Sequence, residues 1–501
     1  MTATAATDET SGLVLRSPRG SIALTATVAA SSMAMLDATI VNVALPHIGE
    51  EFHASVSALQ WVLTGYLLAL ASLILLGGAL GDRFGRRRVF LIGTIWFAVA
   101  SLMSGAAPSI EVLVVARVLQ GIGGALLTPG SLAILQASFR ESDRAKAVGA
   151  WSGLGGVAGA IGPFVGGALV GGPGWRWAFL INLPVAALVV VCARAIPESH
   201  DPHPAPIDFT GAVLGIVALG SSTLAFTEAG PRGWSDPLVM GAGAISIVSA
   251  AAFVWWIMRA RSPLVPPALF RSRNFTVMNF ATALLYAALG VTFFLVAYEL
   301  QVAAGWTALE AGTALLPVTI LMLVGSAPSG ALAQRIGPRL QLTVGPLLAA
   351  AGLLLLTRIG PSASWPTDVL PGALVFGLGL VTFVAPLTAT VMSSADPDHV
   401  SIASGVNNAI ARAANLFAVA IIPVLAGLTA ASGAAEITHS FRVSLTIAAG
   451  VAAAASPLCF FGLSSRARAP RTTRRTYCPV DGSPLQPDPA RCPEPVPARA
   501  A

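Results

Sequence analysis

Charged side chains are scarce in this sequence. They make up 10% of the 501 residues, whereas soluble domains carry about 25%. Hydrophobic residues account for 55%, so the polar surface is too small to cover a water-soluble chain of this length. This balance excludes a soluble enzyme and favours a protein whose helices cross a membrane many times.

Lysine is almost absent, since Lys146 is the only one among 29 basic residues. Ala147 follows it, whereas a P-loop requires Ser or Thr after its lysine. The chain therefore has no Walker A site of its own, and uphill transport needs an ion gradient or a separate ATPase. The basic residues are scattered through short segments between apolar runs, which argues against a nucleic-acid partner because such a partner requires one basic soluble face.

Cysteine and histidine are also rare, with four and six residues. Neither type stands at metal-ligand spacing, and Cys478 and Cys492 have no adjacent thiol or imidazole. We therefore expect no metal and no cofactor. No catalytic constellation is visible, so the chain is predicted not to be an enzyme, and a membrane sensor or integral enzyme is the least favoured class.

Long apolar runs, in contrast, fill most of the chain. A membrane span needs about 20 apolar residues, and the sequence contains fourteen candidates, at residues 21–46, 58–80, 88–106, 110–137, 148–170, 177–197, 209–228, 238–258, 276–300, 310–332, 341–357, 368–392, 403–428 and 441–463. The first run is too long for a signal-peptide core and is interpreted as a retained span. The sequence thus predicts an all-α polytopic membrane protein.

Basic residues are distributed unevenly between the two sides that these spans define. With the N-terminus inside, 23 of the 29 lie on the inner side, 4 on the outer side, and Arg117 and Arg412 lie within spans. Cytoplasmic loops carry the excess of Lys and Arg. We therefore predict a cell-membrane protein (plasma or inner membrane) with both termini in the cytoplasm, including a disordered basic tail at 465–501.

A short sequence occurs twice. Residues 78–87 read GALGDRFGRR and residues 330–339 read GALAQRIGPR, with six identical positions at an offset of 252. Repeats of the same sense imply two bundles related by an axis along the membrane normal. The predicted plan is six helices, two extra helices and six helices. Its segments are a tail at 1–20, a first bundle at 21–197, a two-helix linker at 198–262, a second bundle at 263–464, and the tail at 465–501.

Several motifs resemble one known family. Residues 78–87 resemble the signature loop of the major facilitator superfamily, and LDATIVNVALP at 36–46 resembles the first span of its fourteen-helix drug:proton antiporters. RVLQGIGGA at 117–125 is similar to the proton-transfer motif, and residues 155–167 are similar to the antiporter motif. Trp175 to Pro184 resembles the fourteen-helix subfamily again, whereas the second half matches more loosely. The resemblance implies the major facilitator fold.

Asp37 and Arg117 are the predicted proton-coupling residues. A carboxylate within a span costs about 2.5–3.5 kcal/mol on insertion scales, and protonation or pairing relieves that cost. A buried guanidinium stays charged and needs an acceptor. Because both side chains lie at comparable depth, we expect Arg117 to sense the charge of Asp37, as the resemblance also implies. A static ion pair is the alternative.

Three further groups are candidate functional residues. The conformational switch comprises Gly78, Asp82, Arg83, Gly85, Arg86 and Arg87, with Asp82 expected to accept from a neighbouring helix N-terminus or from one of the arginines. The antiporter motif comprises Gly155, Gly159, Gly162, Pro163, Gly166 and Gly167, whose small residues allow close helix packing. The candidate substrate cavity comprises Asn42, Gln120, Trp61, Tyr66, Tyr286 and Phe293. Glu228 and Glu299 end spans near the outer surface, where we expect them to be hydrated.

The predicted function is that of a proton-coupled multidrug efflux transporter. Asp37 is the only clear mid-span acid, which favours neutral or monocationic amphiphiles and about one proton per molecule. The expected partners are this small-molecule substrate, protons and the lipid bilayer, and the resemblance implies a monomer. A dedicated exporter of one endogenous antibiotic or metabolite is the first alternative, and a proton-coupled importer is the second.

Overall fold

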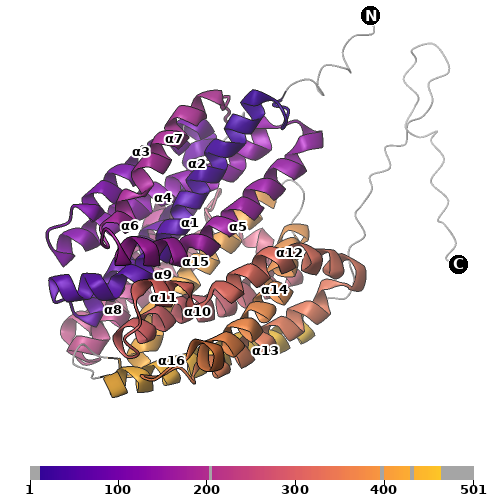
Figure 1. Ribbon diagram of the computed structural model, residues 1–501. Coiled ribbons are helices and arrows are strands. Elements are labelled where there is room, and N and C mark those ends of the chain that lie inside the picture. The colour runs from indigo at the N-terminus through magenta and orange to yellow at the C-terminus, as the bar shows by residue number, and fades with distance from the viewer. Residues whose placement is uncertain (1–11, 202–205, 395–399, 429–433, 464–501) are drawn as a thin grey trace, which may run out of the picture. The chain divides into compact units, whose positions relative to one another are not determined.

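The computed structural model describes residues 12–201, 206–394, 400–428 and 434–463 (Figure 1). The predicted tail at 465–501 lies outside these residues, as do Cys478, Cys492 and most of the predicted tail at 1–20. Within the described part of the chain, regular secondary structure is helical apart from one isolated bridge between Leu13 and Phe139.

Sixteen α-helices and three short helical turns make up the described chain. In chain order they are α1 (Pro18–Phe52), α2 (Val56–Phe84), α3 (Arg86–Gly105), α4 (Ile110–Ser138), α5 (Glu141–Gly171), α6 (Trp177–Leu180), α7 (Asn182–Cys192), η1 (Ala193–Ala195), α8 (Phe209–Arg232), α9 (Pro237–Ile257), η2 (Pro267–Arg271), α10 (Arg273–Val302), α11 (Ala308–Ala314), α12 (Leu316–Ile336), α13 (Pro338–Leu356), η3 (Trp365–Val369), α14 (Leu370–Ser393), α15 (Val400–Leu425) and α16 (Ala434–Gly462).

Serine residues begin three of the first four long helices. Ser17, Ser55 and Ser109 accept hydrogen bonds from the backbone amide three residues later, at 3.1, 3.3 and 3.5 Å. Such caps satisfy amides that have no partner inside the helix. Between the caps the sequence is apolar for more than a membrane thickness, so these segments form long uninterrupted helices.

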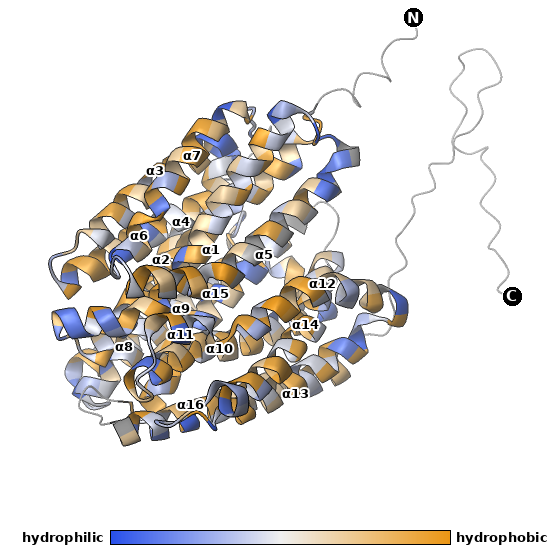
Figure 2. Cartoon of the chain, viewed as in Figure 1, coloured by the Kyte–Doolittle hydropathy of each residue, from blue (hydrophilic) through white to orange (hydrophobic). Residues whose placement is uncertain are grey.

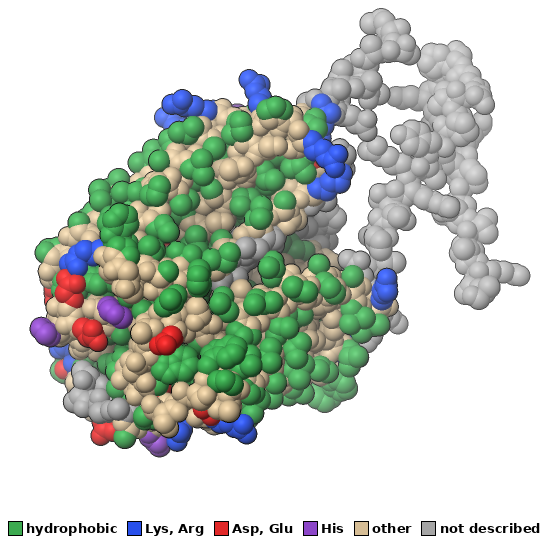
Figure 3. Space-filling model, viewed as in Figure 1, with side chains coloured by type: hydrophobic (Ala, Val, Ile, Leu, Met, Phe, Trp, Pro, Cys, Tyr) green, Lys and Arg blue, Asp and Glu red, His purple; other side chains and the backbone are tan. Residues whose placement is uncertain are grey.

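Thirteen of the described helical segments are long and apolar enough to cross a membrane. The remaining predicted span lies in α5, whose described apolar part, Ile161–Gly171, is shorter than a membrane span. Apolar residues dominate the middle of the helices and polar residues their ends (Figure 2). The surface carries the same pattern, with a broad hydrophobic belt between charged ends (Figure 3). The chain is a multi-pass membrane protein by this criterion, and the count of fourteen spans stays a prediction at α5.

Corresponding helix pairs pack together in the first bundle and in the second bundle. In the first bundle α2 packs on α4, α3 packs on α4, and α1 packs on α5 and α7. In the second bundle α12 packs on α14, α13 packs on α14, and α10 packs on α15 and α16. Between them, α8 and α9 pack on each other, and α8 also contacts α2 and α15. The packing therefore repeats with the period that the duplicated sequence indicates.

Gly85 and Gly337 show the repeat in the backbone itself. They are 252 residues apart, each ends a helix and starts the next, and their φ angles are 107° and 82°. A residue with a Cβ is strained at such angles. The duplicated segments thus make the same tight helix–helix turn, α2 to α3 and α12 to α13.

We call the end of the helices at which α1 begins and α16 ends the terminal end, and the opposite end the far end. Several contacts between the first and second bundles lie toward the far end. Gln301 on α10 donates to the Val43 carbonyl on α1 at 3.1 Å, and Gln60 on α2 donates to the Val419 carbonyl on α15 at 3.2 Å. The two bundles are joined by these bonds and by the packing of α5 on α11.

Candidate functional site

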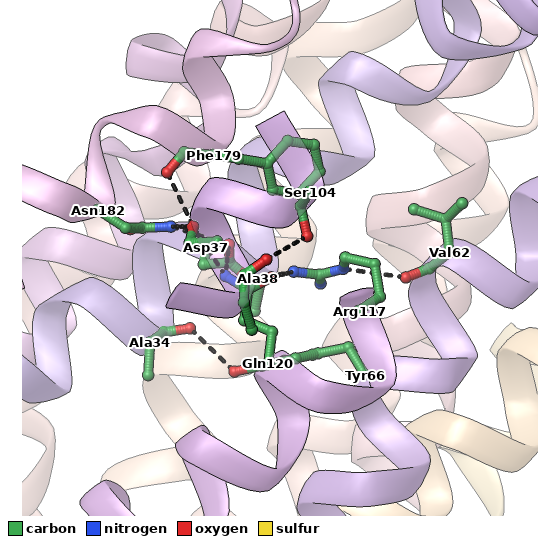
Figure 4. Close-up of polar contacts among 12 residues, drawn as sticks. Ala34, Asp37, Ala38, Val62, Tyr66, Ser104, Arg117, Gln120, Phe179 and Asn182 are labelled. Carbon is green, nitrogen blue, oxygen red and sulfur yellow. Dashed lines mark hydrogen bonds and ion pairs between the residues drawn. The ribbon is translucent and has the colours of Figure 1, made fainter. Parts of the chain in front are cut away.

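Asp37 lies in the interior of the first bundle, within α1. Its Oδ2 accepts a hydrogen bond from Arg117 Nη1 on α4 at 2.6 Å, and both side chains have 0% exposure (Figure 4). The predicted pairing is therefore confirmed. The carboxyl group faces protein on all sides rather than lipid, because none of its surface is accessible.

Three more polar side chains complete the surroundings of Asp37. Its Oδ1 accepts from Gln120 Nε2 at 2.8 Å and from Asn182 Nδ2 at 3.1 Å. Both amides also donate to Ser101 Oγ, at 3.2 and 2.9 Å, and Ser101 in turn donates to the Phe179 carbonyl at 2.8 Å. Helices α1, α3, α4 and α7 thus each contribute one or two polar groups to one buried network.

The local chain path explains the position of Asn182. The run predicted as one span at 177–197 is divided into α6, the linking residue Ile181, and α7, which begins at Asn182. This break brings the Asn182 side chain and the Phe179 carbonyl to the same network. The sequence prediction missed both the break and the role of Ser101.

Arg117 is held by contacts beyond the ion pair. Its Nε donates to the Val62 carbonyl on α2 at 3.1 Å, and Nη1 also donates to Gln120 Oε1 at 2.6 Å. Its Cζ lies 4.4 Å from the centroid of the Tyr66 ring and 5.6 Å from that of Phe179, which is within cation–π range. Nη2 is buried without a hydrogen-bond partner among the described residues.

This network can exist in two electrostatic forms. With Asp37 ionised, the pair is neutral overall and the carboxylate has three donors. With Asp37 protonated, Arg117 keeps its charge and loses its counter-ion in a region of low dielectric, where an unpaired charge is costly. The ion pair between α1 and α4 is therefore possible only in the form with Asp37 ionised.

The predicted switch residues lie at the turn between α2 and α3, at the terminal end. Arg86 forms an ion pair with Asp82 at 2.8 Å, which confirms one of the two expected contacts. The backbone amide of Arg87 donates to Glu198 Oε1 at 3.0 Å, and that of Arg86 donates to the Ser199 carbonyl at 2.8 Å. The segment that follows η1 thus packs on this turn.

The other switch residues differ in their surroundings. Gly85 forms the turn described above, and Gly78 faces Pro129 of α4, with ordinary room for a Cβ. Arg83 lies over the Phe84 ring, 5.9 Å from its centroid.

The antiporter-motif residues lie between α5 and two partners. Gly159, Gly162 and Gly166 face α1, whereas a Cβ at Gly167 would lie 2.6 Å from Leu309 Cα on α11. A Cβ at Gly312 on α11 would lie 2.2 Å from the Pro163 carbonyl oxygen. The expected close packing is confirmed, and α5 contacts the second bundle through it; the surroundings of Gly155 lie outside the described contacts.

The six candidate cavity residues do not form one cluster. Gln120 belongs to the Asp37 network, and Tyr66 is buried beside Arg117. Trp61 donates to Glu228 on α8 at 3.2 Å, so it faces the linker helices. Asn42 donates to the Ala38 carbonyl of its own helix, at 3.0 Å. Tyr286 and Phe293 are half-buried on α10.

Of the two acids expected near the outer surface, Glu299 differs from the sequence expectation. Glu299 is completely buried and accepts from Thr438 Oγ1 at 2.5 Å, because α16 covers the end of α10. The expectation of a hydrated Glu299 was therefore wrong. Glu228 pairs with Arg232 at 3.0 Å and accepts from Trp61.

At the far end, Arg176 connects the loop before α6 to α1. It forms an ion pair with Glu51 at 2.7 Å, and Trp175 Nε1 donates to the same carboxylate at 2.7 Å. The hydrogen bond that Arg176 donates to the Glu51 carboxylate raises the pKa of the Arg176 guanidinium. The Trp175–Arg176 pair noted in the sequence thus closes the first bundle at this end.

Comparison with known sequences finds clear relatives. The model of the Major Facilitator Superfamily matches residues 27–419. The puromycin resistance protein of Streptomyces alboniger is 34% identical over 90% of this chain and 93% of its own length. The tetracenomycin C resistance and export protein of Streptomyces glaucescens is 36% identical over 78% and 73%, and the methylenomycin A resistance protein of Bacillus subtilis is 33% identical over 79% and 86%.

Comparison with solved structures finds the same fold. A bacterial homologue of the human lysosomal transporter Spinster, in an inward-facing and unoccupied conformation, has a TM-score of 0.64 and 17% identity over 89% of this chain and 97% of that chain. The inward-open xylose transporter XylE from E. coli has a TM-score of 0.60 and 16% identity over 89% and 96%. These likenesses show the fold alone.

Proposed function

Because the chain belongs to the Major Facilitator Superfamily, we propose that its buried Asp37–Arg117 pair couples proton entry to the export of amphiphilic small molecules. The observation that carries the proposal is the fully buried ion pair inside the first bundle. The relatives named for antibiotic resistance and export support the direction of transport. The chain acts as a cell-membrane transporter rather than an enzyme, as a monomer, without a cofactor, and with both termini in the cytoplasm.

Alternating access follows from the two forms of the network. Ionised Asp37 pairs with Arg117 and favours capture of the compound from the terminal end, which we place in the cytoplasm. Release at the far end lets a proton reach Asp37, and the neutral acid then accompanies the return. The turn at Asp82 and the packing of α5 on α11 are the proposed moving contacts, since they lie at opposite ends of the bundles.

The available driving force is adequate for this exchange. One charge crossing 100 mV is worth about 2.3 kcal/mol, and one pH unit about 1.4 kcal/mol. One proton exchanged for one neutral molecule therefore sustains roughly a few-hundred-fold gradient. We propose a stoichiometry near one, because Asp37 is the acid in the buried network.

Everted membrane vesicles test this proposal. An imposed proton gradient should drive accumulation of a neutral fluorescent amphiphile such as 1-pyrenebutanol by the wild type, and Asp37→Asn should abolish it at equal membrane expression. Asp236→Asn is the matched control, since Asp236 caps α9 through its side chain and lies outside the network. Gradient-driven accumulation that persists in Asp37→Asn would contradict the proposed role, and flux in the opposite direction would indicate an importer.

A dedicated exporter of one compound is the second candidate. This candidate is favoured by the names of three relatives, each of which refers to one antibiotic. A resistance profile of a sensitive host that expresses the chain separates the two. Protection against one structural class favours the dedicated exporter, whereas protection against unrelated classes favours multidrug export.

A further inference from the structure

Arg412 is a charged residue in the middle of a membrane-spanning helix that the proton-coupling network does not use. It lies 12 residues from the first residue of α15 and 13 from the last. Its side chain is half-buried, and no described ion pair or hydrogen bond engages its guanidinium. An ionisable group at such depth is costly and is typical of a functional site.

The neighbours of Arg412 belong to both bundles. Gln60 contacts Val419, and Leu75 faces Gly405, so α15 runs antiparallel to α2 with Arg412 near the middle of both helices. Arg412 therefore lies where the two bundles face each other.

Polar side chains accompany Arg412 on its own helix. Asn408 and Asn415 stand four residues before it and three after it, a spacing that places all three on one helix face. Both amides are half-buried. Asn415 Oδ1 occupies the space that a Cβ would take at Gly290, so this amide lies directly against the backbone of α10.

The fixed charge of this region is positive. Among the described residues, four charged side chains lie more than six residues from both ends of their helices: Asp37, Arg117, Arg412 and Arg442. Asp37 and Arg117 neutralise each other without any exposure. Arg442 is exposed and donates to the Thr357 carbonyl at the far end. Arg412 alone of the four combines mid-helix depth with partial exposure and an unmatched charge.

We propose that Arg412, with Asn408 and Asn415, binds a carboxylate or another singly charged oxyanion of the exported compound. A guanidinium presents two parallel donors to a carboxylate, and neighbouring amides add further donors. This inference rests on the proposed export function and specifies its substrate class. It departs from the neutral or monocationic compounds expected from the sequence, because an unmatched Arg412 attracts an anion and repels a cation.

Tyr66 links this binding site to the proton-coupling network. Its ring lies 4.4 Å from the Arg117 guanidinium, and it stands on α2 between Gln60 and Leu75, the two residues that contact α15 on either side of Arg412. A bound anion neutralises Arg412 and thereby changes the field at Tyr66. When a proton enters and an anion leaves, both movements carry positive charge inward across the membrane. The sustainable concentration gradient of the anion is therefore roughly 50-fold larger per 100 mV than that of a neutral compound.

The test uses three probes with one skeleton and different charges: 1-pyrenebutyrate, 1-pyrenebutanol and 1-pyrenebutylammonium. Their dissociation constants are measured by fluorescence with the purified full chain in detergent. The wild type should bind the acid about tenfold or more tightly than the ammonium compound, as one charge-assisted hydrogen bond provides. In Arg412→Gln the ratio of acid to alcohol affinity should fall by about tenfold or more, and Arg412→Lys should keep most of it.

Arg358→Gln, which removes an exposed arginine after α13, is the matched control and should leave the ratio unchanged. Equal or tighter binding of the ammonium compound by the wild type overturns the proposal, as does absence of acid binding or an equal loss of acid and alcohol affinity in Arg412→Gln. Proteoliposomes separate the two claims. If the acid preference holds but no probe moves in response to a proton gradient, the export function fails and the anion site stands.

Discussion

Removal of one member of the Asp37–Arg117 pair should destabilise the protein far more than removal of both. Asp37→Asn leaves a guanidinium that is completely buried with its charge unmatched, and Arg117→Gln leaves a carboxylate in the same position. Loss of one partner from a buried pair destabilises by about 3–5 kcal/mol, whereas replacement of both partners is often close to neutral.

The surroundings of the pair refine this magnitude. In Asp37→Asn the side-chain amide can still accept from Gln120 or Asn182, so the loss should lie near the lower limit of the range, about 3 kcal/mol. In Arg117→Gln the carboxylate keeps its two amide donors, and we expect a similar loss. Because each single variant should lose about 3 kcal/mol and the double variant should stay close to the wild type, the coupling energy should be about 6 kcal/mol in favour of the pair.

Equilibrium unfolding in mixed micelles, followed by tryptophan fluorescence, measures these free energies for the wild type, the two single variants and the double variant. Asp236→Asn serves as the control for loss of a carboxylate. Single variants within about 1 kcal/mol of the wild type, together with a coupling energy near zero, would refute the reasoning, because such values are typical of solvent-screened pairs.

Three other substitutions test separate parts of the structure. Gly312→Leu inserts a side chain where a Cβ would already meet the Pro163 carbonyl, so the unfolding free energy should fall by about 1–3 kcal/mol and efflux should slow. Gly171→Ala, where a Cβ has open space, is the control. Efflux at the wild-type rate in Gly312→Leu would be incompatible with this contact. Gly85→Ala forces a Cβ into a φ of 107° and should destabilise by about 1–2 kcal/mol in thermal unfolding, whereas the open site Gly330→Ala should not. Glu299→Gln should leave the number of protons exchanged per molecule unchanged in liposomes, because Glu299 lies outside the Asp37 network; a lower ratio would identify Glu299 as a second proton site.

Much of the fold could be predicted because apolar runs and charge bias are local properties of the sequence. The helices begin and end near the predicted limits, and the duplicated segments at 78–87 and 330–339 make the same turn through Gly85 and Gly337. The helix boundaries at Ile181 and Leu315 were missed although Pro184 and Pro317 follow them, and a proline removes a backbone donor and thereby ends or bends a helix.

The candidate site was partly predictable for a related reason. Counting residues from the span ends placed Asp37 and Arg117 at similar depth, and their contact is confirmed. Ser101 and Asn182 were missed as partners because a neutral polar residue in a span gives no signal of its direction. Glu299 was assigned to the surface from its position near a helix end, whereas its burial depends on α16, which is distant in sequence.

Proton release on substrate binding tests the exchange at Asp37 most directly. The purified full chain in weakly buffered detergent, with a pH indicator dye, is titrated with a neutral amphiphile such as 1-pyrenebutanol. We expect the wild type to release about one proton per bound molecule at a pH where the free carboxyl is protonated, and Asp37→Asn to bind without release. Equal proton release by Asp37→Asn would show that the exchanged proton resides elsewhere.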